Sequence, residues 1–103
     1  MSHLHIVLVD VAEDVESDFD RWYDEVHIPA ILACLGWLSA HRRTCLEGGL
    51  KHVTVYEVSG PEAYATPEFR AIKGFDPFEP YVFNFRRLRL APHDGRQPVA
   101  SPR

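Results

Sequence analysis

Two segments near opposite ends of the chain are apolar on both of the faces that an extended strand presents. Residues 4–10 (LHIVLVD) alternate Ile and Leu on one face with Val on the other. In residues 81–90 (YVFNFRRLRL), strict alternation predicts Tyr81, Phe83 and Phe85 on one face and aliphatic residues on the other. Strands that are apolar on both faces need to be covered on both sides. The chain must therefore fold into a sheet that lies between two layers.

A helical pattern follows the first of these strands. Apolar residues recur at positions 19, 22, 23, 26 and 30, which is the spacing of one face of an α-helix. We expect this helix to run to about residue 35 and to be capped at its start by Ser17 and Asp20. Pro29 removes a backbone donor within the helix, so we also expect a kink or break near residues 27–28.

The remaining segments complete the order strand, helix, strand, strand, helix, strand. Residues 37–44 and 51–58 have the composition of strands, and a Gly-Gly turn between them predicts an antiparallel hairpin. A second helix is expected to start at residues 59–62, to restart or continue at residues 66–68 with Pro67 in a first-turn position, and to end near residue 73. The sequence thus predicts one α+β domain, a four-stranded antiparallel sheet with two helices on one face. This domain would span residues 1–90, with residues 91–103 as a loose polar tail.

Two short helices can cover only one face of a four-stranded sheet. The other face would remain as an exposed apolar patch of the order of several hundred Å², which is large enough to indicate an interface. We expect a second copy of the chain to pack on it, sheet to sheet, as a homodimer. The alternative is a monomer whose tail covers that face, although the tail has few apolar residues.

Composition and charge narrow the possible partners. The net charge of −4 argues against a nucleic-acid surface, which needs clustered basic residues. The longest apolar stretch, near residues 28–38, is interrupted by Pro29 and Gly36 and is too short to span a bilayer. No secretory signal is recognisable, so we expect a cytoplasmic protein in which Cys34 and Cys45 are thiols, Cys34 as a small core residue.

Three stretches of the sequence resemble EthD-like proteins of the dimeric α/β-barrel superfamily. Residues 19–29 (FDRWYDEVHIP) resemble the helix that carries Trp-Tyr and then Glu-x-His-x-Pro in that family. Residues 35–43 (LGWLSAHRR) resemble its glycine-aromatic start of the second strand, and residues 55–70 its third strand and second helix. The match covers about residues 4–90. One departure is Cys-Leu-Gly at residues 34–36, where the family often has a Pro-Gly turn.

The resemblance implies ferredoxin-like subunits that pair into a dimeric α/β barrel, with a pocket between the sheet and the helices of each subunit. It also implies a catalytic role for His27, because related antibiotic-pathway and lactone-isomerising enzymes use a histidine at the matching position. It does not define the reaction, since the superfamily includes cofactor-free monooxygenases, isomerases, cyclases and dehydratases.

Several side chains are candidates for a site in such a pocket. His27 lies at the margin of the apolar stripe, where it can exchange a proton near neutral pH; the alternative is a histidine that caps the kink. Tyr23, four residues earlier, could orient His27 or donate to a substrate oxygen, or could be a core residue. The substrate-binding candidates are Trp22, Trp37, His41, Arg43, Tyr56, Phe83 and Phe85.

The second strand offers basic side chains on both of its faces. His41 and Arg43 share one face and Arg42 takes the other. One of the two arginines could bind a carboxylate or enolate oxygen as a forked donor. More often, such residues lie in solvent or pair with an acid at the end of a strand.

No metal or cofactor is expected, since the six histidines show no paired ligand spacing. We therefore favour a cofactor-independent enzyme that shifts a proton in the isomerisation, cyclisation or dehydration of a small aromatic or polyketide-like metabolite. Such a reaction would belong to secondary metabolism or aromatic degradation. Two alternatives remain: a cofactor-free monooxygenase, and a non-catalytic dimeric protein that binds a ligand or accompanies another enzyme.

Overall fold

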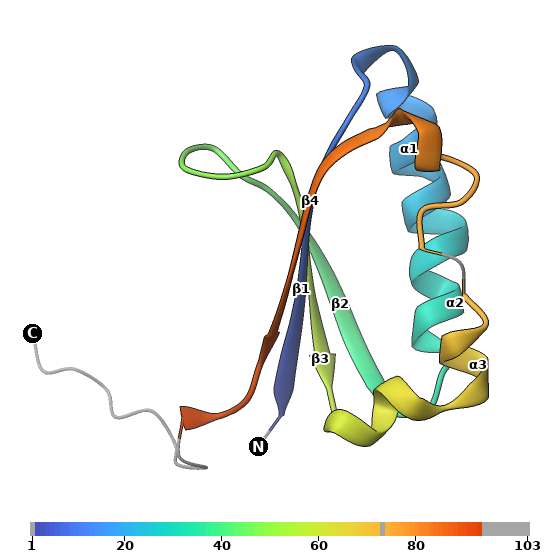
Figure 1. Ribbon diagram of the computed structural model, residues 1–103, viewed down its shortest axis with the longest axis vertical. Coiled ribbons are helices and arrows are strands. Elements are labelled where there is room, and N and C mark those ends of the chain that lie inside the picture. Colours follow the sequence, from blue (N-terminus) through green and yellow to red (C-terminus); the bar gives the residue numbers. More distant parts are fainter. Residues whose placement is uncertain (1, 73, 94–103) are drawn as a thin grey trace, which may run out of the picture.

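The computed structural model describes residues 2–72 and 74–93, which form a sheet with a helical layer on one face (Figure 1). The sheet consists of β1 (His3–Val11), β2 (Trp37–Thr44), β3 (His52–Val58) and β4 (Val82–Leu90). The strands pair antiparallel in the order β2-β3-β1-β4. The predicted sheet is confirmed, and so is the strand order along the chain.

The main helix of the layer runs through three consecutive segments after the short 3₁₀ helix η1 (Glu13–Val15). These are α1 (Glu16–Trp22), the π-helical turn η2 (Tyr23–His27) and α2 (Ile28–Leu32). The irregularity that Pro29 predicts is therefore a wide turn in a continuous helix rather than a break.

The predicted cap at Ser17 is wrong. Residue 17 lies inside α1, and no side chain caps the start of that helix. The reason is that η1 leads directly into α1, so that main-chain carbonyls of the preceding turn accept the first amide protons. The amide of Val15 donates to the carbonyl of Ala12, and that of Glu16 to the carbonyl of Glu13.

The second helix is shorter than the sequence predicts. It consists of the 3₁₀ helix η3 (Pro61–Ala65) and the single-turn α3 (Pro67–Arg70), and the extended residue Thr66 separates them. A residue that precedes proline is disfavoured in the helical region, so Pro67 prevents a continuous helix through Thr66. Thr66 instead caps α3, since its Oγ1 accepts a hydrogen bond from the amide of Phe69 at 3.3 Å.

The core lies between this layer and one face of the sheet. Every second residue of β1 and β3 is buried against the helices, and Phe19, Tyr23 and Trp37 fill the space between them. Cys34 is buried in this core, as expected. The chain enters β2 through Gly36, whose φ is +93° and where a Cβ would lie 2.7 Å from the Cβ of Ala63. Glycine thus allows the close approach of β2 and η3.

A bulge in β4 changes which of its aromatic residues share a face. Val9 pairs with Phe85 and Val11 pairs with Val82, so β4 contains one extra residue opposite β1. Asn84 absorbs it with a φ of +71°. Phe85 consequently faces the helices and lines the cavity, while Phe83 faces the other way; in the single chain both are about half exposed, 49% and 55%. The prediction that Phe83 and Phe85 share a face is wrong for this reason.

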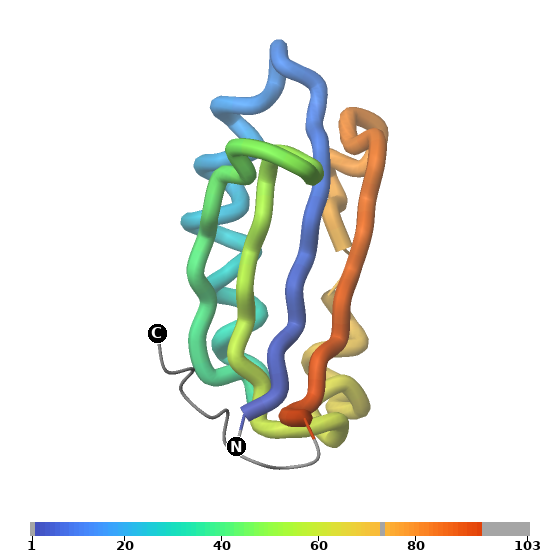
Figure 2. The backbone as a smooth tube through the Cα atoms, turned by 90° about the vertical axis from the view of Figure 1, so that its left-hand side faces the viewer, coloured from blue at the N-terminus to red at the C-terminus, as the bar shows by residue number. Residues whose placement is uncertain are grey.

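None of the helices formed by residues 2–72 and 74–93 lies over the other face of the sheet (Figure 2). Its apolar side chains are half-buried or exposed, and those of the three strands β1, β3 and β4 include Leu4, Ile6, Leu8, Val53, Val55, Leu88 and Leu90. We call this surface the open face. Residues 94–103 of the expected tail lie outside the described residues, so the tail is not placed relative to the open face.

The helices of the described part of the chain are too short and too polar to cross a membrane.

Candidate functional site

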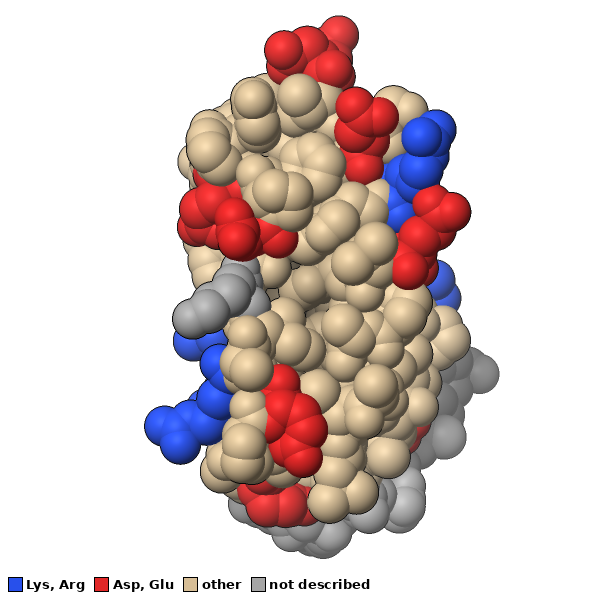
Figure 3. All heavy atoms as spheres, turned by 90° about the vertical axis from the view of Figure 1, so that its right-hand side faces the viewer, with Lys and Arg blue, Asp and Glu red and all other residues tan. Residues whose placement is uncertain are grey.

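A cavity of about 220 Å³ lies between the helical layer and the sheet. Seen from the helical side, the surface around it is mostly uncharged, and the charged side chains lie toward the margins (Figure 3). Most of its lining residues are aromatic or aliphatic, and the full set is His5, Val7, Tyr23, His27, Ile31, Trp37, Tyr56, Phe69, Ile72, Gly74, Phe75, Phe85 and Arg87. The cavity is therefore suited to a small, largely apolar ligand.

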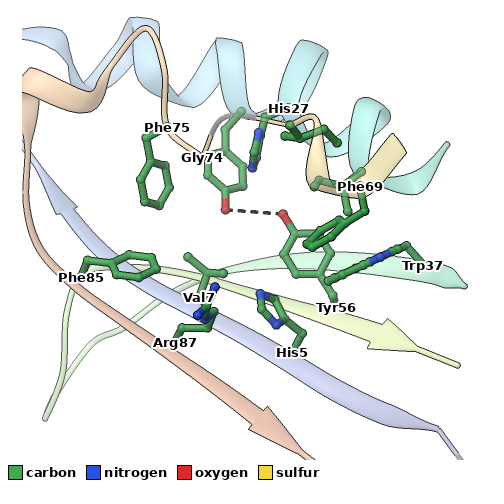
Figure 4. Close-up of a pocket in the computed structure, with 13 residues that line it drawn as sticks. His5, Val7, His27, Trp37, Tyr56, Phe69, Gly74, Phe75, Phe85 and Arg87 are labelled. Atoms are coloured by element: carbon green, nitrogen blue, oxygen red, sulfur yellow. Dashed lines mark hydrogen bonds between the residues drawn. The ribbon is translucent and has the colours of Figure 1, made fainter. Parts of the chain in front are cut away.

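His27 is the last residue of the π-helical turn and lies in the helical wall of the cavity (Figure 4). Its ring stacks on Trp22, with centroids 4.8 Å apart, and meets Tyr23 edge-on at 4.9 Å. Burial lowers the pKa of His27 to about 4, so its imidazole is neutral at pH 7. No residue in the described part of the chain hydrogen-bonds to this ring. The ring therefore does not cap the helix, and one of its nitrogens offers a free lone pair.

Tyr23 and Tyr56 are two tyrosines of the cavity lining, and Figure 4 shows Tyr56 with its hydroxyl in a hydrogen bond. The Tyr56 hydroxyl donates to that of Tyr23 over 3.5 Å, which is long for a hydrogen bond. Burial raises the pKa of both phenols, so both stay protonated and can donate to a ligand oxygen. It is the ring of Tyr23, not its hydroxyl, that contacts His27.

His5 lies in the sheet wall of the cavity and was not among the predicted site residues. Its Nδ1 is 2.9 Å from the Tyr64 hydroxyl, and its ring meets Trp37 edge-on at 5.2 Å. Burial, together with the charges of Arg87 and Arg89, lowers the pKa of His5 to about 4. The sequence did carry a signal, because alternation along the strand places position 5 on the same face as the buried valines.

Arg87 is the second wall residue that the sequence reasoning missed. It pairs with Val7 across the β1–β4 ladder and follows Phe85 by two residues, so it points to the same side of the sheet. The loop before β4 adds Phe75, whose ring is 5.4 Å from that of Phe85.

The structure brings five predicted site residues together in the cavity wall: Tyr23, His27, Trp37, Tyr56 and Phe85. Trp22 does not line the cavity but stacks against His27 from behind. His41, Arg43 and Phe83 are exposed and lie on the open face, away from the cavity.

Arg42 faces the helices, as alternation along β2 requires, but it does not line the cavity. Its guanidinium lies 3.0 Å from Asp20 and 3.1 Å from Asp24, and it covers the ring of Tyr23 at 4.7 Å. Arg42 therefore ties the helix to the sheet. Neither arginine of β2 takes part in the cavity wall.

Among the described residues, no group of three His, Cys, Asp or Glu side chains is arranged to hold a metal ion.

The sheet order and the single helical layer define a ferredoxin-like α+β domain. Solved structures share this fold. A dimeric ferredoxin-like protein from an uncultured marine organism matches with a TM-score of 0.65 at 15% identity, covering 97% of this chain and 93% of that one. An EthD family protein from Bacillus halodurans C-125 matches with a TM-score of 0.62 at 16% identity, covering 84% of this chain and 96% of that one.

An uncharacterised NIPSNAP-like domain protein from Burkholderia xenovorans matches with a TM-score of 0.61 at 15% identity, covering 96% of this chain and 91% of that one. No protein-family model and no curated protein matches the chain. At these identities the likeness establishes the fold and confirms the predicted ferredoxin-like architecture. This likeness does not indicate a particular activity.

Proposed function

We propose that the chain is a homodimeric, cofactor-independent enzyme in which His27 moves a proton on a small single-ring metabolite. One observation carries the proposal: a neutral imidazole with no hydrogen-bond partner among the described residues lies in the wall of an aromatic cavity. The His27 ring is half-buried, and its nitrogens are not among the buried unpartnered side-chain atoms of the described residues. A lone pair of the imidazole is therefore open to a ligand in the cavity.

The lowered pKa defines the direction of the first proton transfer. A neutral imidazole is a base at pH 7, so His27 would remove a proton from an acidic C–H or O–H group of the ligand. The hydroxyls of Tyr23 and Tyr56 would stabilise the charge that develops on a ligand oxygen. The imidazolium that forms in this buried position is acidic and returns the proton readily. Return to another carbon gives an isomerisation, and return to a hydroxyl leaving group gives a dehydration.

The size of the cavity narrows the substrate class. An apolar cavity of about 150 Å³ is large enough to hold benzene. The volume of about 220 Å³ therefore accommodates one substituted ring. This favours an aromatic or enolic monocycle over a polyketide with several rings.

Dimerisation through the open face is part of the proposal. One of the solved structures of this fold is described as a dimeric ferredoxin-like protein. The β1, β3 and β4 part of the open face is largely aliphatic, and no helix of the described residues covers it, which favours sheet-to-sheet packing of two domains of residues 1–90. Both Cys34 and Cys45 are free thiols, which supports our proposal of a cytoplasmic protein.

Solvent deuterium exchange tests the proposed chemistry directly. A panel of enolisable single-ring ketones and phenols is incubated with the protein in D₂O, and exchange at carbon is followed by NMR. We expect accelerated exchange for at least one compound, and a loss of about 10²- to 10⁴-fold in the His27→Gln variant. His3→Gln is the matched control, because His3 lies on β1 outside the cavity wall.

Two results would contradict the proposal: no exchange with any compound, or a folded His27→Gln protein that is as active as the wild type. Circular dichroism confirms that each variant is folded. Oxygen uptake with the same compounds, measured in an oxygen electrode, would instead identify a cofactor-free monooxygenase.

A further inference from the structure

Arg87 is a cation in the wall of an otherwise aromatic and aliphatic cavity. Its side chain forms no salt bridge with a carboxylate anywhere in residues 2–72 and 74–93. Arg42, which points toward the helices from the opposite edge strand β2, is bound by two aspartates. The guanidinium donors of Arg42 are thus paired with carboxylates, whereas those of Arg87 are available to a ligand carboxylate.

The sheet side of the cavity is electropositive around this residue. Arg89 pairs with His5 across the ladder, and its guanidinium covers the ring of Tyr64 at 3.7 Å. Both Arg87 and Arg89 disfavour a positive charge on His5. The same field that disfavours a cation at this place favours an anion.

We propose that the cavity binds a single-ring ligand that carries one carboxylate, with the carboxylate against Arg87 and the ring among Trp37, Phe69 and Phe75. This inference rests on the proposed function and names its substrate class. A carboxylate is costly to bury unless it is paired, and the planar guanidinium offers two parallel donors for it. The aromatic walls supply the apolar contact for the ring.

The arrangement also orients the ligand. His27 lies in the helical wall and Arg87 in the sheet wall, on opposite sides of the cavity (Figure 4). A ligand held by its carboxylate at Arg87 therefore directs the far part of its ring system toward His27. The anion site and the base act on different ends of the same molecule.

Isothermal titration calorimetry with benzoate and its neutral analogue benzamide tests this inference. We expect the wild-type protein to bind benzoate at least tenfold more tightly than benzamide at pH 7. Arg87→Gln should weaken benzoate binding by about 10- to 100-fold and leave benzamide binding unchanged. Arg21→Gln, which removes the same charge from the exposed surface of α1, should bind benzoate as the wild type does.

Equal affinity for the two ligands, no saturable binding of benzoate, or unchanged benzoate binding by a folded Arg87→Gln protein would overturn the inference. If that variant does not fold, the side-chain Nε–H resonance of Arg87 in wild-type protein provides the readout. A shift of this resonance that saturates with benzoate supports the contact, and an unmoved resonance contradicts it.

The two proposals can fail separately. Benzoate binding that depends on Arg87, with no deuterium exchange in any compound, would support the anion site and contradict the catalytic proposal. The exchange assay is also run with carboxylated analogues of the same ketones and phenols. Exchange that depends on His27 but is as fast for the neutral compounds as for their carboxylated analogues would support the catalytic proposal and contradict the anion site.

Discussion

At the scale of single residues, two histidines reach the same cavity from opposite layers, the half-buried His27 from the helix and the buried His5 from β1 (Figure 4). Burial is the largest cause of the lowered pKa in both cases, and for His5 the two nearby arginines add to it. Both rings are therefore neutral at pH 7, and the permanent positive charge of the cavity wall resides on Arg87.

The lowered pKa values of these two histidines lead to a prediction of how the stability of the folded protein depends on pH. Their pKa is about 4 in the folded protein and 6.5 in the unfolded chain, so the unfolded state binds more protons between these values. The free energy of unfolding should consequently fall as the pH is lowered from about 6.5 to about 4, with a slope that corresponds to up to about two protons. Urea unfolding at a series of pH values measures the free energy of unfolding and its slope with pH.

Variants separate this effect from that of the carboxylates. Asp10 and Glu16 have lowered pKa values as well. The stability that these two carboxylates contribute to the fold is lost only as the pH falls below their ordinary pKa range near 4. His27→Gln should therefore have a smaller slope than the wild type between about pH 5 and 6.5. An identical slope in that interval would show that His27 is protonated normally in the folded protein.

At the scale of elements, local irregularities decide which side chains enter the cavity. The π-helical turn places Tyr23 and His27 together in the helical wall. The bulge at Asn84 turns Phe85 and Arg87 toward the helices and leaves Phe83 on the open face. Bulges often re-aim side chains near functional sites in this way.

The bulge makes a specific demand on residue 84. Its φ of +71° is unfavourable for a β-branched residue, and its Nδ2 donates to the Asp10 carboxylate at 3.1 Å. Asn84→Val should therefore lower the free energy of unfolding by about 1–2 kcal/mol or more. It should also weaken benzoate binding, because Arg87 lies three residues further along the strand.

Asn84→Gly is the matched control, since glycine adopts a positive φ without strain but cannot bond to Asp10. Urea denaturation of the three proteins compares them. We expect the Gly variant to lie between the wild type and the Val variant. A Val variant as stable as the wild type would show that the bulge is not strained at this position.

At the scale of the whole molecule, the helices of the described residues cover one face of the sheet and leave the other without a helix (Figure 1). Val7, Val9 and Val58 are buried under the helices, whereas Leu88 and Leu90 on the open face are 36% and 41% exposed in the single chain. A second copy would cover these residues and enclose the sheet on both sides, as its two-sided apolar strands require.

Light scattering coupled to size-exclusion chromatography tests this assembly. We expect the wild-type protein to have twice the chain mass of 11.8 kDa. Ile6→Lys should shift it to the single-chain mass, because a lysine on the middle of the open face would be buried without a partner. Leu35→Lys is the control, since Leu35 is 79% exposed before β2. A wild-type particle with the single-chain mass of 11.8 kDa would contradict the proposed dimer.

Several residues of the site could be predicted from the sequence, but the sequence did not show which residues line one cavity together. Helical spacing placed Tyr23 and His27 on one side of a helix, and Trp37 and Tyr56 fell on strands that face it. His5 and Arg87 were missed although their strands were recognised. A single polar residue on an apolar face looks the same in sequence whether it lies in the core or beside a cavity.

The sequence by itself determined the order of elements and the need for two covered faces, because hydrophobic periodicity depends only on the local geometry of helix and strand. Only the tertiary structure decided that Phe85 and Arg87 enter the cavity while Phe83, His41 and Arg43 do not. That outcome depends on one extra residue in β4 and on which face of the sheet the helices cover. Both are set by packing between segments that lie far apart in the chain.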